Sequence, residues 1–232
     1  MNDCTSKIAV FFSSPLKHGK DGAEYSLDAT SLREIEAVAL HDLVRESGAK
    51  RTLEIGLALG GSAIAIAEAL KKNGADCRHV AVDPYQRAFG HIGESELETL
   101  GLIDIVNVIS RPSEEVLYEM ARAGDRFDII FNDGAHTIGD KVTNTYFADR
   151  CLTLSGIMVF HDAFLPATVA SVQYLLQERC YRIIRLPPDS VAKRRLRVVR
   201  YALRYGRWFA SKVVPFTCRS LVAVRKTCEP EY

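Results

Sequence analysis

The stretch RTLEIGLALGGSAIAIAEAL, residues 51–70, decides the fold of this 232-residue chain. Its apolar opening is typical of a buried strand, and its alanine-rich second half is typical of a helix. Three glycines, Gly56, Gly60 and Gly61, separate the two. A strand, a glycine turn and a helix in this order form the first unit of a parallel α/β sheet, in which ligands bind beside the turn.

Strand and helix patterns alternate along the rest of the chain. Further strands are expected at 79–83, 103–109, 126–133, 156–162, 181–186 and 218–226. Helices are expected at 27–47, about 62–73, 94–102, 113–124, 141–152 and 167–179. This alternation predicts a single α/β domain over 1–232, Rossmann-like and doubly wound. Its seven-stranded sheet is expected to be mostly parallel, with helices on both faces and an antiparallel last strand.

The composition excludes several classes of protein. A net charge of +1 gives no overall field that would attract nucleic acid or a membrane. No apolar run approaches the roughly 18 residues that a membrane span needs. The six cysteines are scattered without a C-x-x-C pair, which argues against a zinc site or a disulfide framework and favours a reducing cytoplasm.

The glycine turn discriminates between ligands. A phosphate-binding P-loop would need a lysine after Gly61, and a dinucleotide fingerprint would need glycine where Ala58 stands. The turn instead carries Glu54 two residues before Gly56, and an acid there suits a cationic ligand. S-adenosylmethionine has an ammonium and a sulfonium, and Asp83, at the end of the second strand, lies where a carboxylate accepts hydrogen bonds from ribose hydroxyls.

With EIGLALGGSAIAIAEAL, AVDPY and FDIIFNDGAH…LSGIMVFHDA, the chain resembles the class I S-adenosylmethionine-dependent methyltransferases. It is most similar to the small-molecule O-methyltransferases related to the macrocin and catechol enzymes. The resemblance covers about 30–186 and the last strand. It implies that the first glycines line the methionine end of the cofactor, Asp83 takes the ribose and 110–113 flank the base. The expected cofactor-binding residues are Glu54, Gly56, Gly60, Ser62, Asp83, Ser113 and Asp133.

Acids and histidines follow the fourth and fifth strands. Asp133, His136 and Asp162 are the candidate catalytic residues, with His136 as the base because an imidazole is the side chain suited to accept a proton near neutral pH. His161 is interpreted as a packed residue or as one that supports the strand-end acids from outside the site, because it precedes Asp162 and successive strand residues face opposite sides. Asp133 and Asp162 match the metal-binding aspartates of metal-dependent relatives, so Mg²⁺ is a candidate second cofactor. Ala163 removes the third protein ligand of that pattern, and metal dependence stays open.

A basic insertion, 187–217, lies between the last two strands and carries eight lysines and arginines against one aspartate. If helical, it presents Lys193, Arg197, Arg200, Arg204 and Arg207 as one cationic stripe. A solvated helix covering the acceptor pocket or a subunit contact is one interpretation. The others are an acidic or phosphate-bearing acceptor, peripheral contact with an anionic membrane through 193–212, or an acidic partner; nucleic acid is least favoured.

These observations predict an enzyme that transfers a methyl group from S-adenosylmethionine to an oxygen, or less readily a nitrogen, of a small molecule. The acceptor pocket is expected to draw on 1–48, and a homo-oligomer is one option for the assembly. Two alternatives remain at this point. One is an NAD-dependent oxidoreductase, which Ala58 disfavours, and the other is a non-catalytic nucleoside-binding module that acts through the basic helix.

Overall fold

The computed structural model describes residues 6–30, 32–134, 136–187, 201, 203–204, 206 and 211–229. Its contacts divide the chain into two compact units, Met1–Val116 and Leu117–Tyr232. Seven strands form a sheet in the order β5-β4-β3-β6-β7-β9-β8, and two short strands, β1 and β2, form a separate hairpin. The predicted sheet is confirmed, while a single domain over the whole chain stays a prediction.

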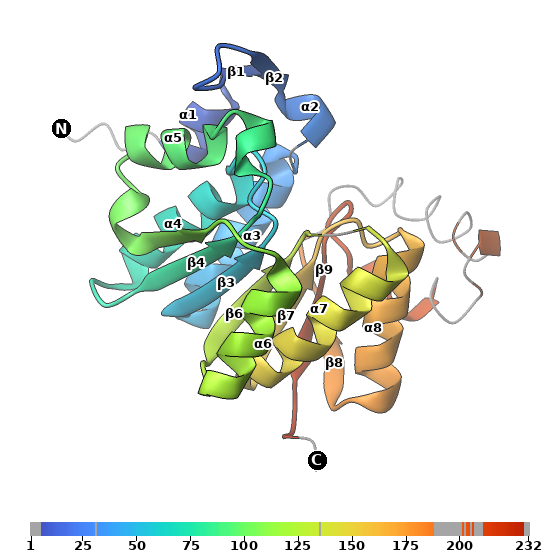
Figure 1. Ribbon diagram of the computed structural model, residues 1–232. Coiled ribbons are helices and arrows are strands. Elements are labelled where there is room, and N and C mark those ends of the chain that lie inside the picture. Colours follow the sequence, from blue (N-terminus) through green and yellow to red (C-terminus); the bar gives the residue numbers. More distant parts are fainter. Residues whose placement is uncertain are drawn as a thin grey trace. The chain divides into compact units, whose positions relative to one another are not determined.

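Unit 1 holds three parallel strands, in which β3 pairs with β4 and β4 pairs with β5. Helix α3 packs against α4, and α1 packs against both (Figure 1). The bounds are α1 Lys7–Phe12, β1 Leu16–His18, β2 Glu24–Ser26, α2 Leu27–Thr30, α3 Glu34–Ser47, β3 Arg51–Ile55, α4 Gly61–Asn73, β4 Arg78–Val82, η1 Gln86–Phe89, α5 Ile92–Thr99, η2 Ile103–Ile105 and β5 Val106–Ile109.

The helix expected over 27–47 is interrupted in the structure. Leu32 and Arg33 are not helical, and α3 begins only at Glu34. The carboxylate of Glu36 accepts a 2.9 Å hydrogen bond from the Arg33 amide, which caps the start of α3. The hairpin that precedes α2 was not predicted. It packs beside α5, where the Lys20 amide donates to the Gly90 carbonyl at 2.8 Å.

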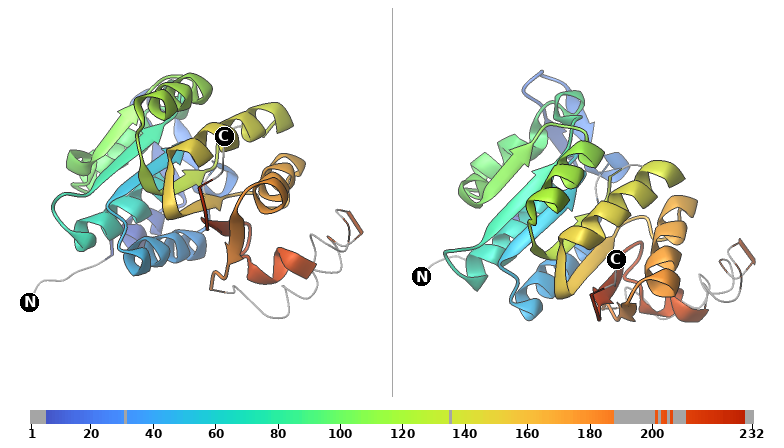
Figure 2. Two further views of the ribbon diagram at one scale, coloured as in Figure 1. Left: turned by 90° about the horizontal axis from the view of Figure 1, so that it is seen from below. Right: turned by 60° about the horizontal axis from the view of Figure 1, so that its bottom comes forward.

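Helix α6, Ser113–Ala123, spans the boundary between the units. Unit 2 contains β6 Phe127–Asn132, α7 Ile138–Cys151, β7 Leu152–Phe160, α8 Pro166–Glu178, β8 Tyr181–Ile184, η3 Val214–Phe216 and β9 Val222–Lys226. Strands β6 and β7 are parallel, and β9 is antiparallel to both β7 and β8. Helices α7 and α8 pack against each other and run side by side in each view (Figure 2).

Local signals explain where these elements begin. Thr137 accepts a hydrogen bond from the Asp140 amide at 3.2 Å, which caps α7, and Pro166 occupies the first turn of α8. Strands β3 and β6 are almost continuously buried, as is β7 from Gly156 onward, which is expected for strands covered by helices. Within the described residues, no helix is long and apolar enough to cross a membrane.

The cysteine interpretation is wrong on one point. Cys180, just before β8, and Cys228, just after β9, form a disulfide. The spacing gave no sign of the pair because 48 positions separate the two cysteines, and only the antiparallel pairing of β8 with β9 brings them together. The remaining described cysteines, Cys77, Cys151 and Cys218, are buried and form no disulfide.

Candidate functional site

The glycine turn of unit 1 has a backbone that requires glycine. Gly56 and Gly60 have φ angles of 91° and 89°, in the left-handed region. A Cβ atom on Gly60 would lie only 2.9 Å from the Cα atom of Gly93, so the first turn of α5 packs directly against the glycine turn. The turn therefore has a defined shape at the start of α4, where helix amide groups can bind a negatively charged group.

Asp83 holds this turn from the neighbouring strand. The side chain is almost fully buried, and its Oδ2 atom accepts hydrogen bonds from the amides of Leu57 at 3.0 Å and Ala58 at 2.8 Å. Gln86 Nε2 donates to the same oxygen at 2.9 Å, and the Tyr85 amide donates to Oδ1 at 2.7 Å. Asp83 therefore supports the turn through its backbone amides, and Asp83 as a ribose ligand stays a prediction.

Glu54 is completely buried below the turn and has partners inside unit 1. The hydroxyl of Ser62 donates to one of its oxygens, and His79 Nε2 lies 3.3 Å from the other. The second ring nitrogen of His79 lies 2.9 Å from the Thr52 hydroxyl. A row of buried polar side chains thus joins β4, β3 and the start of α4. Sequence reasoning gave His79 no role, although it stands beside Thr52 in the register of the two strands.

Ser113, the residue predicted to contact the base, is half-buried and is the first residue of α6. The segment that precedes it follows β5 directly. Ser113 thus lies just beyond the carboxyl end of β5. Glu54 and Asp83 likewise lie at the carboxyl ends of β3 and β4. This edge of a parallel sheet is where ligands of such folds bind.

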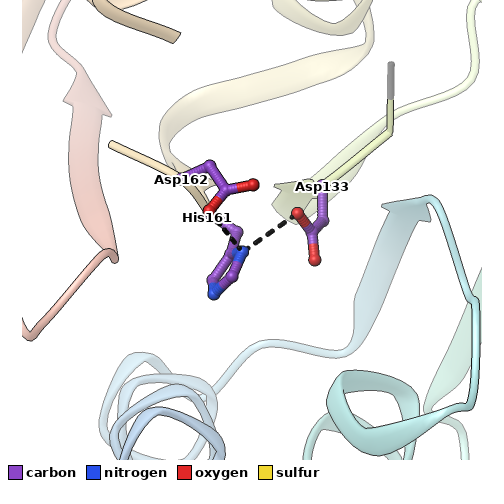
Figure 3. A group of neighbouring side chains, drawn as sticks. All are labelled: Asp133, His161 and Asp162. Atoms are coloured by element: carbon purple, nitrogen blue, oxygen red, sulfur yellow. Dashed lines mark ion pairs between the residues drawn. The ribbon is translucent and has the colours of Figure 1, made fainter. Parts of the chain in front are cut away.

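In unit 2, two predicted catalytic residues, Asp133 and Asp162, lie together with His161 at the ends of β6 and β7. The Nδ1 atom of His161 lies 3.2 Å from Asp133 Oδ1 and 3.5 Å from Asp162 Oδ1. In Figure 3, dashed lines join a nitrogen of the imidazole ring to each of the two carboxylates. We name Asp133, His161 and Asp162 the acid–histidine cluster. His161 therefore faces the strand-end acids rather than lying packed behind them.

Two features hold the cluster in this arrangement. Asp162 has a φ angle of 52°, which is uncommon for a residue other than glycine and is typical of functional sites. The hydroxyl of Ser220 lies 3.1 Å from His161 Nε2, and the Ser220 carbonyl accepts a 2.8 Å hydrogen bond from the Ala163 amide. The turn before β9 thus orients the imidazole so that Nδ1 faces the acids. No sequence motif pointed to Ser220.

His136, the predicted base, lies at the edge of the cluster. Its Nδ1 atom is 3.8 Å from Asp162 Oδ2, and 61% of its side chain is exposed to solvent. The structure therefore brings together all three predicted catalytic residues, Asp133, His136 and Asp162. The exposure of His136 leaves it accessible to a small acceptor.

Lys141 is a residue that sequence reasoning missed. It lies on α7 and is completely buried, and its Nζ atom donates to the carbonyls of Asn132 at 3.1 Å and Gly134 at 2.8 Å. Burial lowers the pKa of Lys141 to about 8, while the charges of Asp133 and Asp162 oppose that shift. In the sequence, Lys141 stands eight positions after Asp133, at the start of the helix expected over 141–152. Its position there did not indicate that its side chain turns back toward Asp133.

The cluster has the donor groups of a metal site. Asp133, His161 and Asp162 can each offer one ligand atom, and these atoms lie within 4.8 Å of one another. Carboxylate oxygens are ligands for Mg²⁺, whereas an imidazole nitrogen favours transition metals such as Mn²⁺ or Zn²⁺. The third potential donor of this group is His161, whereas Ala163 offers none.

Most of the basic insertion lies outside the described residues, including Lys193, Arg197, Arg200 and Arg207 of the predicted stripe. Among its described contacts with the rest of unit 2, one lies close in sequence to Asp162. The Tyr201 ring stacks on Phe164, with ring centres 4.1 Å apart and planes 9° from parallel. Since Phe164 is two residues from Asp162, this contact places Tyr201 near the acid–histidine cluster.

Known proteins similar to this chain include methyltransferases. A family described as a methyltransferase domain matches residues 53–163, from β3 to the residue after Asp162. Residues 53–163 are therefore similar to a methyltransferase domain. Tricin synthase 1 from Oryza sativa subsp. japonica is 33% identical to the chain over 164 residues. The aligned part covers 67% of this chain, which spans only 56% of the rice protein.

Two solved structures share the fold of the methyltransferase domain. The O-methyltransferase from Bacillus cereus, in complex with SAH, has a TM-score of 0.57 and 21% identity, and the match covers 67% of this chain and 74% of that one. The O-methyltransferase TomG from Streptomyces achromogenes, in complex with SAM, has a TM-score of 0.56 and 21% identity. That match covers 96% of this chain and 87% of TomG, so it includes the parts outside residues 53–163.

Proposed function

We propose that the chain is a methyltransferase that moves the methyl group of S-adenosylmethionine to an oxygen of a small-molecule acceptor. The observation that carries the proposal is the methyltransferase-domain match over 53–163. This stretch includes both the glycine turn and the acid–histidine cluster. The O-methyltransferases among the structural matches, which were solved with SAH or SAM, support the choice of cofactor.

The residues of unit 1 fit this cofactor. S-adenosylmethionine carries a carboxylate, which the amide groups at the start of α4 suit, and an ammonium, which the carboxylate of Glu54 suits. We assign the cofactor to Glu54, Gly56, Gly60, Ser62, Asp83, Ser113 and Asp133. Asp83 Oδ1 accepts one hydrogen bond from the chain, from the Tyr85 amide, and a carboxylate oxygen can accept a second from a ribose hydroxyl.

On the acceptor side, we assign His136 as the base. When bound, S-adenosylmethionine supplies an electrophilic methyl group, and an acceptor hydroxyl must lose its proton as it attacks. His136 accepts that proton, and Asp162, 3.8 Å away, stabilises the imidazolium that results. Asp133 and Asp162 orient the acceptor. A divalent ion such as Mg²⁺ would be held by these two aspartates with His161, where it would polarise the acceptor oxygen.

The two alternative functions gain no support. Ala58 occupies the middle position of the turn with a φ angle of 45°, where a dinucleotide fingerprint has glycine. The basic helix of the non-catalytic alternative lies largely outside the described residues. The relatives reported above are named as O-methyltransferases or as a synthase, and none is named as an oxidoreductase.

Further features of the acceptor and the assembly belong to the same proposal. The acceptor carries an acidic or phosphate group that the basic insertion recognises, and 1–48 contributes to its pocket. A homo-oligomer and membrane contact through 193–212 are secondary options, and nucleic acid is the least favoured partner. A cytoplasmic location was inferred from the cysteines, but the Cys180–Cys228 disulfide weakens that inference because cytosolic proteins rarely keep disulfides.

Calorimetry with S-adenosylhomocysteine and with NAD tests the proposal directly. We expect saturable heat with the nucleoside and none with NAD. Incubation with methyl-labelled S-adenosylmethionine and a panel of phenols and hydroxy acids then identifies the acceptor by mass spectrometry. Absence of heat with S-adenosylhomocysteine would overturn the proposal, whatever the result with any acceptor.

A further inference from the structure

Lys141 is the most deeply buried cation near the acid–histidine cluster among the described residues, and nothing in the proposed reaction uses it. Its two hydrogen bonds go to the carbonyls of Asn132 and Gly134, the residues on either side of Asp133. The ammonium is therefore tied to the backbone that presents the Asp133 carboxylate. A change at Lys141 would reach Asp133 through this short turn.

The charge of this lysine needs compensation inside unit 2. A completely buried ammonium loses its hydration, and its two carbonyl partners carry no net charge. Both Asp133 and Asp162 act on Lys141 in the direction that favours its charged form. One oxygen of each aspartate lies within 3.5 Å of His161 Nδ1, so their negative charges are concentrated in one small region. The lysine and the two acids therefore balance one another.

We infer that Lys141 is the resident counter-ion of the acid–histidine cluster, held behind Asp133 by the carbonyls of Asn132 and Gly134. It is a positioning residue, because it acts through Asp133 and Asp162 rather than on a substrate. The inference depends on the proposed function in one respect only, which is that the acid–histidine cluster takes part in the reaction. A fixed positive charge there supplies part of what a divalent cation would supply, and so it competes with such a cation.

Competition between the Lys141 charge and a divalent cation can be distinguished experimentally from a purely structural role of Lys141. Structural damage to the turn would weaken the binding of a divalent cation to the cluster, whereas removal of a competing charge would strengthen it. Manganese chloride is titrated by calorimetry into metal-free wild-type protein, Lys141→Met and Lys141→Arg. Lys226→Met is the matched control. Lys226 is also buried and also donates to two backbone carbonyls, those of Asp149 and Leu152.

The control lysine lies well away from the cluster. Val222 pairs with Phe160, the residue before His161, while Arg225 pairs with Ile157. Lys226 is thus four positions further along β9 than Val222, or about 13 Å at the usual rise of a strand. Lys226→Met therefore removes a buried positive charge, as Lys141→Met does, but leaves the hydrogen bonds on either side of Asp133 unchanged.

We expect Lys141→Met to bind Mn²⁺ at least roughly tenfold more tightly than wild type, with Lys141→Arg and Lys226→Met unchanged. The gain should disappear when Asp133→Asn is added. Unchanged or weaker binding in Lys141→Met, an equal gain in Lys226→Met, or a gain that survives Asp133→Asn would overturn the inference. If Lys141→Met does not fold, Lys141→Gln gives the same prediction. Calorimetry with S-adenosylhomocysteine on the same samples keeps the proposed function separate, because its failure there leaves the Mn²⁺ comparison intact.

Discussion

The Asp83 carboxylate at the end of β4 accepts a 2.8 Å hydrogen bond from the amide of Ala58, in the turn after β3. This contact ties the two strand ends of unit 1 together before any ligand binds. A cofactor that enters the turn would therefore meet a backbone already held in shape. The residue first chosen for its expected contact with a ribose also supports the turn itself.

We expect Asp83→Asn to weaken S-adenosylhomocysteine binding by tenfold or more and to destabilise the protein by about 1–3 kcal/mol, because buried amides lose their charged acceptor. Turnover at saturating cofactor should fall less than cofactor affinity. Calorimetry and urea denaturation measure the two effects, with the exposed Asp76→Asn as control. An Asp83→Asn variant with wild-type affinity would remove Asp83 from both roles.

His136→Ala should behave in the opposite way. Loss of the base is expected to lower kcat by about 100-fold or more while the dissociation constant of S-adenosylhomocysteine stays within a factor of two. Steady-state kinetics with the identified acceptor, together with calorimetry, provides the comparison. His18→Ala, at another exposed histidine paired with an acid, is the control. Equal losses in kcat and in cofactor affinity would argue against His136 as the base.

Stability should depend on pH through Lys141. Its pKa is lowered from 10.5 to about 8 in the folded protein. Between these values the unfolded chain holds the proton that the folded protein has released, so the free energy of unfolding rises with pH. The rise, up to about 3 kcal/mol, should be complete near pH 10.5 and absent below pH 8.

Urea denaturation of wild type and Lys141→Met from pH 7 to 10 isolates this contribution as the difference between the two curves. Lys141→Arg provides the control, since arginine keeps its charge throughout the range. A difference that stays constant with pH would show that Lys141 does not change its protonation in this way.

Reduction of the Cys180–Cys228 disulfide should destabilise unit 2. The bridge closes a loop of 48 positions, and chain-entropy arguments give about 4 kcal/mol as the upper range of its contribution. Urea denaturation with and without dithiothreitol measures the change. The double variant Cys180→Ser and Cys228→Ser should match the reduced protein and respond to the reductant no further. Identical midpoints for oxidised and reduced wild type would contradict this expectation.

The sequence predicted the sheet and the strand ends better than their surroundings. Asp133 and Asp162 could be placed together because parallel strands end at one edge of a sheet. The side chains that orient them could not, since Lys141 arrives from α7 and Ser220 from a turn nearly 60 residues beyond His161. The disulfide depends in the same way on the antiparallel pairing of β8 with β9. Long-range contacts of this kind leave no periodic signal in the chain.

The hairpin β1–β2 and the break before α3 were also missed. Leu16–His18 and Glu24–Ser26 are too short for an alternating pattern to stand out, and an isolated hairpin of this length depends on what it packs against. Lys17, on β1, pairs with Glu96 of α5 at 3.3 Å, which shows what the hairpin packs against. The conformation of the hairpin therefore depends on this tertiary contact rather than on the local preferences of its residues.

The bridge between Cys180 and Cys228 changes what a protease can do to the chain. A cut at any peptide bond between the two cysteines, including one inside the basic insertion, would yield two fragments that remain joined through sulfur. The nicked molecule would keep β9 between β7 and β8 and would run as one species on a gel until a reductant separated it.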